Sequence, residues 1–413
     1  MQKPSDLRAL VAGLKKKYPT SGIGSGLAVR PNNLKRVTTG SLMLDYVLGG
    51  GLPLGRMTIF YGKESSGKST AAYRTMGNAQ DLCANCFRFV EIEDVVEDEN
   101  GDWHAEATCD CVKKGIFVPK QLDGEKDAEY AQRLVAMSKN SYSEFICCLV
   151  DVEGSFEMEW ATAVGLDARR LFMVIPNSAE EGIDTSVALL QSGAVHLLCV
   201  DSIAALTPSK ELEESTESWQ MGLQARLVNK FARMSGMALN STMGEYGFPP
   251  TMIWINQVRT KIGQSYGDTD SLPGGAGQSF LASAIVKFWA AQFKGGKEEG
   301  MDFNITLNAD EKVKRANTVR TCFKIMKNKT APPKAASSFV MGLTGSDKGR
   351  VVDESVYVDT GMKLGLIIKS SGKLHMGSQE FPSAKQMCVW LEENYDDKRV
   401  LRERLVSKML ENS

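Results

Sequence analysis

The chain has 413 residues, of which 43% are hydrophobic, and its formal net charge at pH 7 is −1. This length predicts two or three domains with a sizeable buried core. The balanced charge excludes a protein that coats DNA through a uniformly basic surface, so any nucleic-acid contact must come from local patches. No run approaches the ~18 apolar residues of a membrane span. We expect no signal peptide, no membrane contact and a reducing cytosol in which the nine cysteines are free or bind metal.

The first segment is expected to form a short amphipathic helix. Its apolar residues recur at helical spacing, at Leu7, Leu10, Val11 and Leu14. Such a helix is too short to be a domain, so it either packs on the core or docks on another subunit. We assign residues 1–30 to this helix and to a linker rich in glycine, serine and proline.

A phosphate-binding signature follows the linker. The apolar run at 57–61 leads to Gly62. After four intervening residues come Gly67, Lys68 and Ser69, before a helix-compatible stretch. This pattern between a strand and a helix predicts a site for a nucleoside triphosphate. Its glycines turn backbone N–H groups toward the phosphates, its lysine reaches the β- and γ-phosphates, and its serine hydroxyl can bind Mg²⁺. The predicted nucleotide contacts are Gly62, Glu64, Ser65, Ser66, Gly67, Lys68, Ser69 and Thr70.

Short apolar runs alternate with helical segments through the middle of the chain. The runs lie at 57–61, 145–151, 171–175, 196–201, 251–257 and 321–326. Near-continuous apolar strands between helices predict an α/β fold with a mostly parallel central sheet, covered on both faces. We place this core at residues 31–80 and 145–349. A small α/β domain at 350–413 is expected to follow and to end in helices at 383–394 and 397–411.

Three of these runs end in, or are followed by, polar residues, namely Asp201, Glu153 and Gln257. The carboxyl ends of parallel strands lie at the sheet edge where the phosphate loop also opens. Asp201 can therefore hold Mg²⁺ through water, and Glu153 can orient and deprotonate the attacking water. The Gln257 amide can sense the γ-phosphate by hydrogen bonding.

Residues 81–144 form an unusually long connection between the phosphate-loop helix and the next predicted strand. We interpret this block as an insertion with its own fold. Its acidic stretch argues against contact with DNA phosphates and favours docking of a protein partner. It contains a C-x-x-C pair and a C-x-C pair that could complete a tetrahedral Zn²⁺ site, although four unrelated reduced thiols are the alternative. The predicted zinc ligands are Cys83, Cys86, Cys109 and Cys111.

Several long motifs resemble those of the bacterial RecA recombinase family. They are TTGSLMLDYVLGGGLPLGR (38–56), YGKESSGKS (61–69), VDVEG (150–154), SGAVHLLCVDSIAALTP (192–208), MGLQAR (221–226), INQVRTKIG (255–263) and KNKTAPP (327–333). The resemblance covers the chain except for the insertion at 81–144. It implies a RecA-like P-loop ATPase core and DNA-dependent hydrolysis of ATP with Mg²⁺. It also implies a helical filament on single-stranded DNA that exchanges strands with homologous duplex DNA, in a bacterial cytosol or, if phage-encoded, a host cytosol.

The resemblance also implies roles for individual residues of the ATP site. The implied catalytic set is Glu153, Lys68, Gln257, Lys327 and Lys329, and its last two lysines would reach the ATP of the neighbouring subunit, as an arginine finger does. Ser69 and Asp201 match Mg²⁺-binding positions. Trp160 stands where the family usually has a tyrosine stacked on adenine. The N-terminal helix matches the family's polymerisation arm, which favours docking on a neighbouring subunit.

Two segments, 208–222 and 256–278, match the family's DNA-binding loops. The first is acidic and the second is rich in glycine and locally basic. By resemblance, each loop inserts an apolar wedge between nucleotides while nearby cations and backbone groups meet phosphates. The implied DNA contacts are Met221, Arg226, Arg233, Arg259, Lys261, Ile262, Gly274 and Gly275.

Two other functions remain open from the sequence. A ring-forming DNA motor of the helicase or branch-migration type would share the ATPase strands, and closed six-membered rings would distinguish it. A filament scaffold that binds ATP without hydrolysing it would show no DNA-stimulated turnover and no effect of Glu153→Gln.

Overall fold

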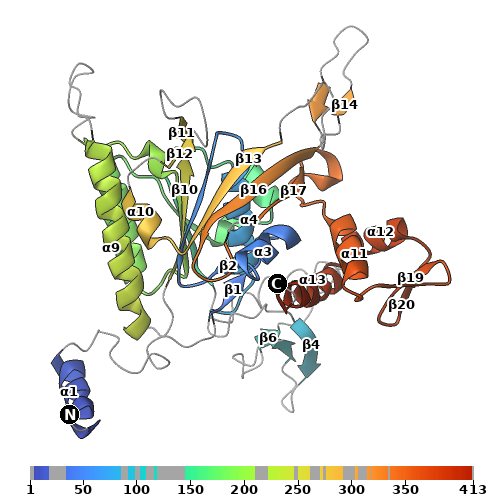
Figure 1. Ribbon diagram of the computed structural model, residues 1–413, viewed down its shortest axis with the longest axis horizontal. Helices are drawn as coiled ribbons and strands as arrows, with labels where there is room; N and C mark the ends of the chain where they lie inside the picture. The colour runs from blue at the N-terminus through green and yellow to red at the C-terminus, as the bar shows by residue number, and fades with distance from the viewer. Residues whose placement is uncertain are drawn as a thin grey trace.

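Figure 1 shows the computed structural model of the chain. The structure describes residues 4–17, 34–84, 92–97, 103–107, 116–118, 145–209, 222–245, 250–260, 270–272, 276–291, 303–305, 314–316, 318–333 and 335–411.

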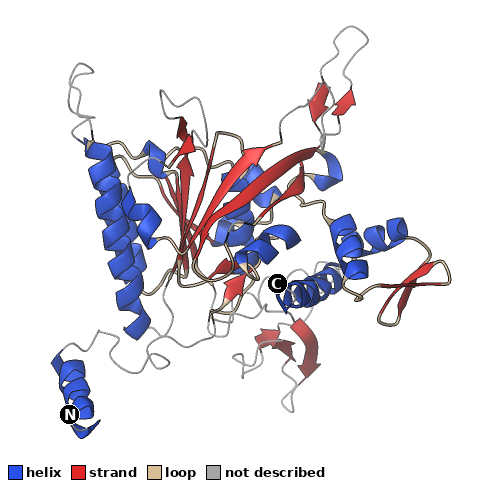
Figure 2. Cartoon of the chain, viewed as in Figure 1, coloured by secondary structure: helices blue, strands red, loops and turns tan. Residues whose placement is uncertain are grey.

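An eight-stranded sheet forms the centre of the molecule (Figure 2), in the order β17-β16-β13-β3-β10-β9-β7-β8. The strands from β13 to β8 are parallel to their neighbours, whereas β16 and β17 are antiparallel. The prediction of an α/β fold with a mostly parallel sheet is confirmed. The strands are β3 (Met57–Gly62), β7 (Cys147–Asp151), β8 (Leu171–Val174), β9 (Leu197–Asp201), β10 (Thr251–Gln257), β13 (Ala284–Ala290), β16 (Thr318–Asn328) and β17 (Ala336–Gly342).

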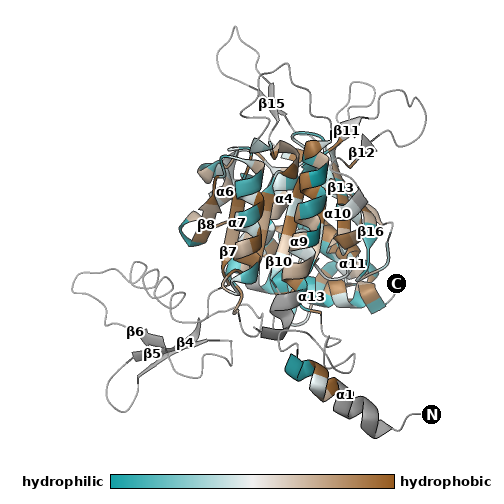
Figure 3. Ribbon diagram, turned by 90° about the vertical axis from the view of Figure 1, so that its left-hand side faces the viewer, coloured by the Kyte–Doolittle hydropathy of each residue, from teal (hydrophilic) through white to brown (hydrophobic). Residues whose placement is uncertain are grey.

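Helices cover both faces of this sheet because successive side chains of a strand point to opposite sides. In β3, Phe60 packs into a cluster with α4, whereas Ile59 packs into a second cluster with α7 and α9. Phe231 of α9 stacks on Trp254 of β10, with ring centroids 4.7 Å apart. Figure 3 shows α7 and α9 side by side in front of the sheet. The helices of the core are α3 (Leu42–Leu48), α4 (Lys68–Gln80), α6 (Met158–Ala163), α7 (Ala179–Gln191), α9 (Leu223–Glu245) and α10 (Ala276–Leu281).

The C-terminal segment has an apolar cluster of its own, which Leu42 of α3 joins from the core. The helix α13 packs against both α3 and α11. Two helices end the segment as predicted, with α13 beginning two residues earlier than expected. The elements are α11 (Glu354–Lys363), β18 (Ile368–Ser370), β19 (Lys373–Met376), β20 (Gln379–Phe381), α12 (Ala384–Glu393) and α13 (Tyr395–Glu411).

The N-terminal helix α1 (Pro4–Lys17) lies apart from the sheet in Figures 1 and 3. Within the block at 81–144, three short strands pair antiparallel in the order β4-β5-β6. No helix among the residues described is long and apolar enough to cross a membrane. The remaining strands are β1 (Arg36–Val37), β2 (Leu52–Pro53), β4 (Ile92–Glu97), β5 (Trp103–Ala107), β6 (Ile116–Val118), β11 (Arg259–Thr260), β12 (Asp270–Ser271), β14 (Phe303–Ile305) and β15 (Lys314–Ala316).

Candidate nucleotide site

The predicted phosphate loop connects the end of β3 to the start of α4. A Cβ atom at Gly62 would lie 2.2 Å from the carbonyl oxygen of Phe288, so only glycine fits there. Gly67 has a φ of 86°, in the left-handed region that favours glycine. The Ser66 hydroxyl donates to the Lys63 carbonyl at 2.7 Å and closes the turn. The backbone therefore curls in front of the helix N-terminus, where N–H groups can receive an anion.

Lys68, the first residue of α4, is only 7% exposed. Its Nζ donates to the Lys63 carbonyl oxygen at 2.7 Å, which holds the ammonium group against the loop. Burial lowers the pKa of Lys68, and the nearby carboxylates of Asp201, Glu153 and Glu64 oppose this effect. A buried cation thus lies at the loop, close to the carboxylates that the sequence predicted to share the site.

Asp201 ends β9 and is 1% exposed. Its carboxylate accepts hydrogen bonds from the Tyr73 hydroxyl at 3.1 Å and from the Ser69 hydroxyl. Burial raises the pKa of Asp201 to about 6, although these two hydrogen bonds act in the opposite direction. Hydroxyl and carboxylate oxygens are ligands that Mg²⁺ prefers. Ser69 and Asp201 are therefore a donor set that fits the predicted Mg²⁺.

Glu153 follows β7 and meets the end of β10 across the sheet edge. The Gln257 side chain donates through Nε2 to Glu153 Oε1 at 2.9 Å. The Ser202 hydroxyl donates to the same oxygen. The sequence predicted Glu153 and Gln257 at the ends of two different strands. In the structure their side chains are in direct contact. Ser202 was not predicted, but its position directly after Asp201 was a signal that could have found it.

Trp160 lies on α6, beside the helix that follows the phosphate loop. Its indole Nε1 donates to the Thr70 hydroxyl at 3.2 Å. The N-cap residue Glu157 accepts a hydrogen bond from the backbone N–H of Trp160 at 2.8 Å and fixes the start of α6. The predicted adenine-stacking residue and the predicted loop residue Thr70 are therefore in contact.

Lys327 and Lys329 lie at the opposite edge of the sheet. In the sheet register, Lys327 is level with Ile285, near the start of β13, whereas the phosphate loop follows the other end of β3. The Lys329 ammonium donates to the Phe280 carbonyl at 2.9 Å, and that of Lys327 donates to the Ser279 carbonyl. These lysines do not approach the phosphate loop of their own chain, so any contact with ATP must be made with another subunit.

The predicted DNA-binding residues are described only in part. Arg226 and Arg233 lie on α9, where both are exposed, and Lys230 between them adds a third exposed cation. These three residues follow one another at helical spacing, so they form a basic stripe. Arg259 begins the short strand β11. The other predicted contacts lie outside the described residues, namely Met221, Lys261, Ile262, Gly274 and Gly275.

The predicted zinc ligands also lie mostly outside the described part of the chain. Cys83 is described and is 1% exposed, whereas Cys86, Cys109 and Cys111 are not. Among the residues that are described, no group of three or more histidine, cysteine or acidic side chains could hold a metal ion. The zinc site stays a prediction.

Comparisons with known proteins identify the family of the chain. The family described as "RecA N-terminal domain" matches residues 7–139 and 125–345. A protein named "Protein RecA" from Fusobacterium nucleatum subsp. nucleatum is 29% identical over 354 residues, which are 84% of this chain and 72% of the relative. "Protein RecA" from Staphylococcus aureus is 27% identical over 409 residues, covering 97% of this chain and 92% of the relative. Since the matched residues make up most of the chain, it belongs to the RecA family.

Proposed function

We propose that this protein is an ATP-dependent homologous recombinase that forms helical filaments on single-stranded DNA and exchanges strands with a homologous duplex. The observation that carries the proposal is the hydrogen bond between Gln257 and Glu153, at the sheet edge that also presents Lys68. It connects a candidate general base to β10, and the segment that follows β10 is one of the two candidate DNA-binding segments. DNA binding can therefore change the position of Glu153 and with it the rate of hydrolysis.

In this proposal, the loop from Gly62 to Thr70 binds the phosphates of ATP, and Lys68 stabilises the charge on the β- and γ-phosphates. Glu153 orients and deprotonates the attacking water. Ser69 and Asp201 hold Mg²⁺, which neutralises charge developing on the phosphates. Trp160 stacks on adenine. These residues come from separate strands and helices, and the fold brings them together at one edge of the sheet.

Filament formation would complete the site. Lys327 and Lys329 would contact ATP bound to a neighbouring subunit, because they lie far from their own phosphate loop. The helix at the N-terminus would dock on that neighbour. ATP would then be bound between subunits, and its hydrolysis would weaken both the subunit contact and the grip on DNA.

DNA would be bound by the exposed cations of α9 together with the two candidate loops. Arg226 and Arg233 would meet phosphates, and Arg259 would act from the second loop. The same role is proposed for Lys261, Gly274 and Gly275, with Met221 and Ile262 as wedges between nucleotides. Phosphate contacts of this kind supply affinity that depends on salt and is independent of sequence.

We further propose the division of the chain that the sequence predicted. Residues 1–30 form the oligomerisation arm, 31–80 and 145–349 the ATPase core, and 350–413 a small C-terminal domain. The block at 81–144 would be an inserted subdomain that docks a protein partner and binds Zn²⁺ through Cys83, Cys86, Cys109 and Cys111. The zinc would stabilise a block that is too small to rely on its own core. We place the protein in the cytoplasm.

The proposal is tested by measuring phosphate release from ATP with and without single-stranded DNA. We expect strong stimulation by DNA in the wild type and a fall of about 10²- to 10⁴-fold in Glu153→Gln, the range expected when a general base is removed. The matched control is Glu159→Gln, since Glu159 is a surface residue paired with Lys348. Equal turnover with and without DNA would overturn the proposal, and closed rings by electron microscopy would favour a ring-forming motor instead.

A further inference from the structure

Three polar side chains meet where the strands β7, β9 and β10 end, and the proposed general base lies between the other two. Glu153 Oε1 accepts a hydrogen bond from the Gln257 side chain at 2.9 Å and another from the Ser202 hydroxyl. Two hydrogen bonds fill the accepting sites of one carboxylate oxygen. Within the described part of the chain, no group donates a hydrogen bond to Glu153 Oε2. The carboxylate is thus held through one oxygen, and the other is left for a water molecule.

The two donors differ in their surroundings. Ser202 follows β9 and is 0% exposed, whereas Gln257 is partly exposed and lies at the start of the candidate DNA-binding segment at 256–278. A hydroxyl without access to solvent has to find its hydrogen-bond partner within the protein. The contact made by Ser202 is therefore independent of DNA, whereas the contact made by Gln257 can change when that segment binds DNA.

The chain around Ser202 also holds the backbone of Glu153. The carbonyl oxygen of Asp201 accepts hydrogen bonds from the N–H of Val152 at 2.7 Å and from that of Glu153 at 3.3 Å. Asp201 is level with Asp151 in the parallel pairing of β7 with β9. Backbone and side chain of the proposed general base are thus fixed to two successive residues, the first of which is the proposed Mg²⁺ ligand.

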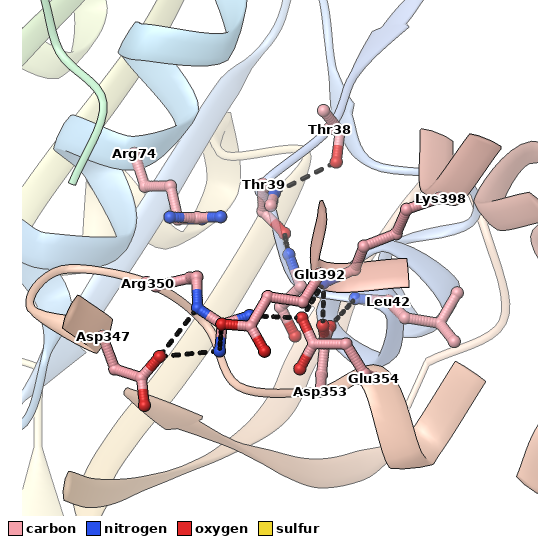
Figure 4. A network of polar contacts seen from close by, with 12 residues as sticks. Thr38, Thr39, Leu42, Arg74, Asp347, Arg350, Asp353, Glu354, Glu392 and Lys398 are labelled. Atoms are coloured by element: carbon pink, nitrogen blue, oxygen red, sulfur yellow. Dashed lines mark hydrogen bonds and ion pairs between the residues drawn. The ribbon is translucent and has the colours of Figure 1, made fainter. Parts of the chain in front are cut away.

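The donors that hold Glu153 are uncharged. In the C-terminal segment, by contrast, Glu354 is paired with Arg350 and Lys398, as Figure 4 shows. A cation at hydrogen-bond distance stabilises the ionised form of a carboxylate and so weakens it as a base. Lys68 is near enough to interact electrostatically with Glu153, but its ammonium group donates to a backbone carbonyl of the phosphate loop. The contacts of Glu153 therefore suit a carboxylate that is oriented and can still accept a proton.

We propose that Ser202 is a positioning residue for ATP hydrolysis, whose hydroxyl fixes Glu153 through Oε1 so that Oε2 meets the attacking water whether or not DNA is bound. Gln257 would add the DNA-dependent part of the same orientation. In the reaction, the water gives one proton to Glu153 as its oxygen bonds to the γ-phosphorus, and the bond from that phosphorus to the bridging oxygen of ADP breaks. Ser202 keeps its own proton. The inference rests on the proposed ATPase and assigns a role to a residue that the proposed function does not use.

The test compares ATP hydrolysis by Ser202→Ala and by the wild type, with and without single-stranded DNA. We expect kcat to fall about tenfold in both conditions, because one hydrogen bond to a charged group is lost, while KM for ATP stays within about twofold. The stimulation by DNA should be unchanged, since Gln257 is intact. The matched control is Ser186→Ala, which should leave kcat unchanged. Ser186 is equally buried, and its hydroxyl donates to the Gly182 carbonyl at 2.6 Å within α7.

The same substitution in a second background separates positioning from a general loss of structure. Glu153→Gln lacks the general base, so adding Ser202→Ala should cause no further fall in kcat, whereas a damaged fold would lower the rate again. An unchanged kcat in Ser202→Ala, or a further tenfold fall in the double variant, would overturn the inference and leave the proposed ATPase intact. A wild-type rate in Glu153→Gln alone would overturn both.

Ser202→Cys provides the answer if Ser202→Ala does not fold. The thiol occupies nearly the space of the hydroxyl but is a weak hydrogen-bond donor. We expect a kcat at least about threefold below that of the wild type, with an unchanged midpoint of urea denaturation. A wild-type kcat in Ser202→Cys would contradict the inference, because packing alone would then account for Ser202.

Discussion

Asp45 and Asp201 are carboxylates that the fold buries almost completely, yet their surroundings differ. Asp45 accepts hydrogen bonds from the Thr38 hydroxyl, from the backbone and hydroxyl of Thr39, and from Arg402. Four contacts use the whole accepting capacity of a carboxylate. Within the part of the chain that the structure describes, the Asp201 side chain accepts hydrogen bonds from Tyr73 and Ser69, and burial raises its pKa.

The difference indicates that the buried charge of Asp45 stabilises the fold, whereas that of Asp201 serves the nucleotide site. Asp45 joins α3 to α13, and no accepting capacity remains for a ligand. The Asp201 carboxylate accepts two hydrogen bonds from described residues, one of them from Ser69 of the phosphate loop, so it keeps accepting capacity that a cation there can use. The same residue type thus stabilises the fold in one place and costs stability in the other.

Of the variants, Asp45→Ala is expected to lower the free energy of unfolding the most. This change leaves Arg402 buried without its carboxylate, and removing one partner of a buried ion pair typically costs about 3–5 kcal/mol. We expect a loss of that size in the free energy of unfolding, measured by urea denaturation. Glu159→Ala should leave the urea midpoint unchanged, because Glu159 and Lys348 form their ion pair at the surface. A small loss in Asp45→Ala, similar to that of the control, would remove the contrast between the two carboxylates.

In contrast, Asp201→Asn is expected to raise the free energy of unfolding. The pKa of Asp201 is about 6 in the folded protein, against a reference value of 3.8. The folded state therefore binds more protons than the unfolded state between these values, and the wild type loses stability as pH rises through them. Without Mg²⁺ and nucleotide, we expect Asp201→Asn to be more stable than the wild type by about 1–3 kcal/mol at pH 7.

The pH dependence of this gain provides its check. Urea denaturation at pH 5 and pH 7 should show the advantage of Asp201→Asn growing by about 1 kcal/mol, because the wild type carries the buried charge only at the higher pH. ATP hydrolysis should be lost in the same variant. An advantage that does not change with pH would mean that the Asp201 carboxylate is stabilised by contacts beyond Tyr73 and Ser69.

The nucleotide site could be predicted from sequence because the residues that define it lie in short, continuous segments of the chain. The phosphate loop is one continuous motif, and each apolar run that was predicted to be a strand lies in the central sheet. The strands β13 and β17 were missed, because Lys287 interrupts the first run and Ser337 and Ser338 interrupt the second. Both strands pair with the antiparallel strand β16, and these three polar side chains are only partly buried there, so the sheet tolerates them.

The contacts of the C-terminal segment could not be predicted in this way. Asp45 and Arg402 are 357 residues apart, and Asp353 reaches the backbone N–H of Leu42 from 311 residues away. No spacing rule connects residues at such separations, since only the docking of α13 on α3 brings them together. The contact of Tyr73 with Asp201 was not predicted, but part of it could have been. Tyr73 follows Ser69 by four residues on α4, so helical spacing could have placed both side chains toward Asp201.

The smallest effect, expected from Tyr73→Phe, tests whether the support of Asp201 matters for Mg²⁺. The change removes one buried hydrogen bond to the carboxylate, which is worth about 1 kcal/mol. If that bond orients Asp201, the Mg²⁺ concentration that gives half-maximal ATP hydrolysis should rise about fivefold while the maximal rate is kept. The control is Tyr357→Phe, a buried tyrosine of the C-terminal segment, which should leave the Mg²⁺ dependence unchanged. Equal Mg²⁺ dependence in both variants would mean that Ser69 and the strand end alone fix Asp201, and that Tyr73 contributes only packing against Phe156.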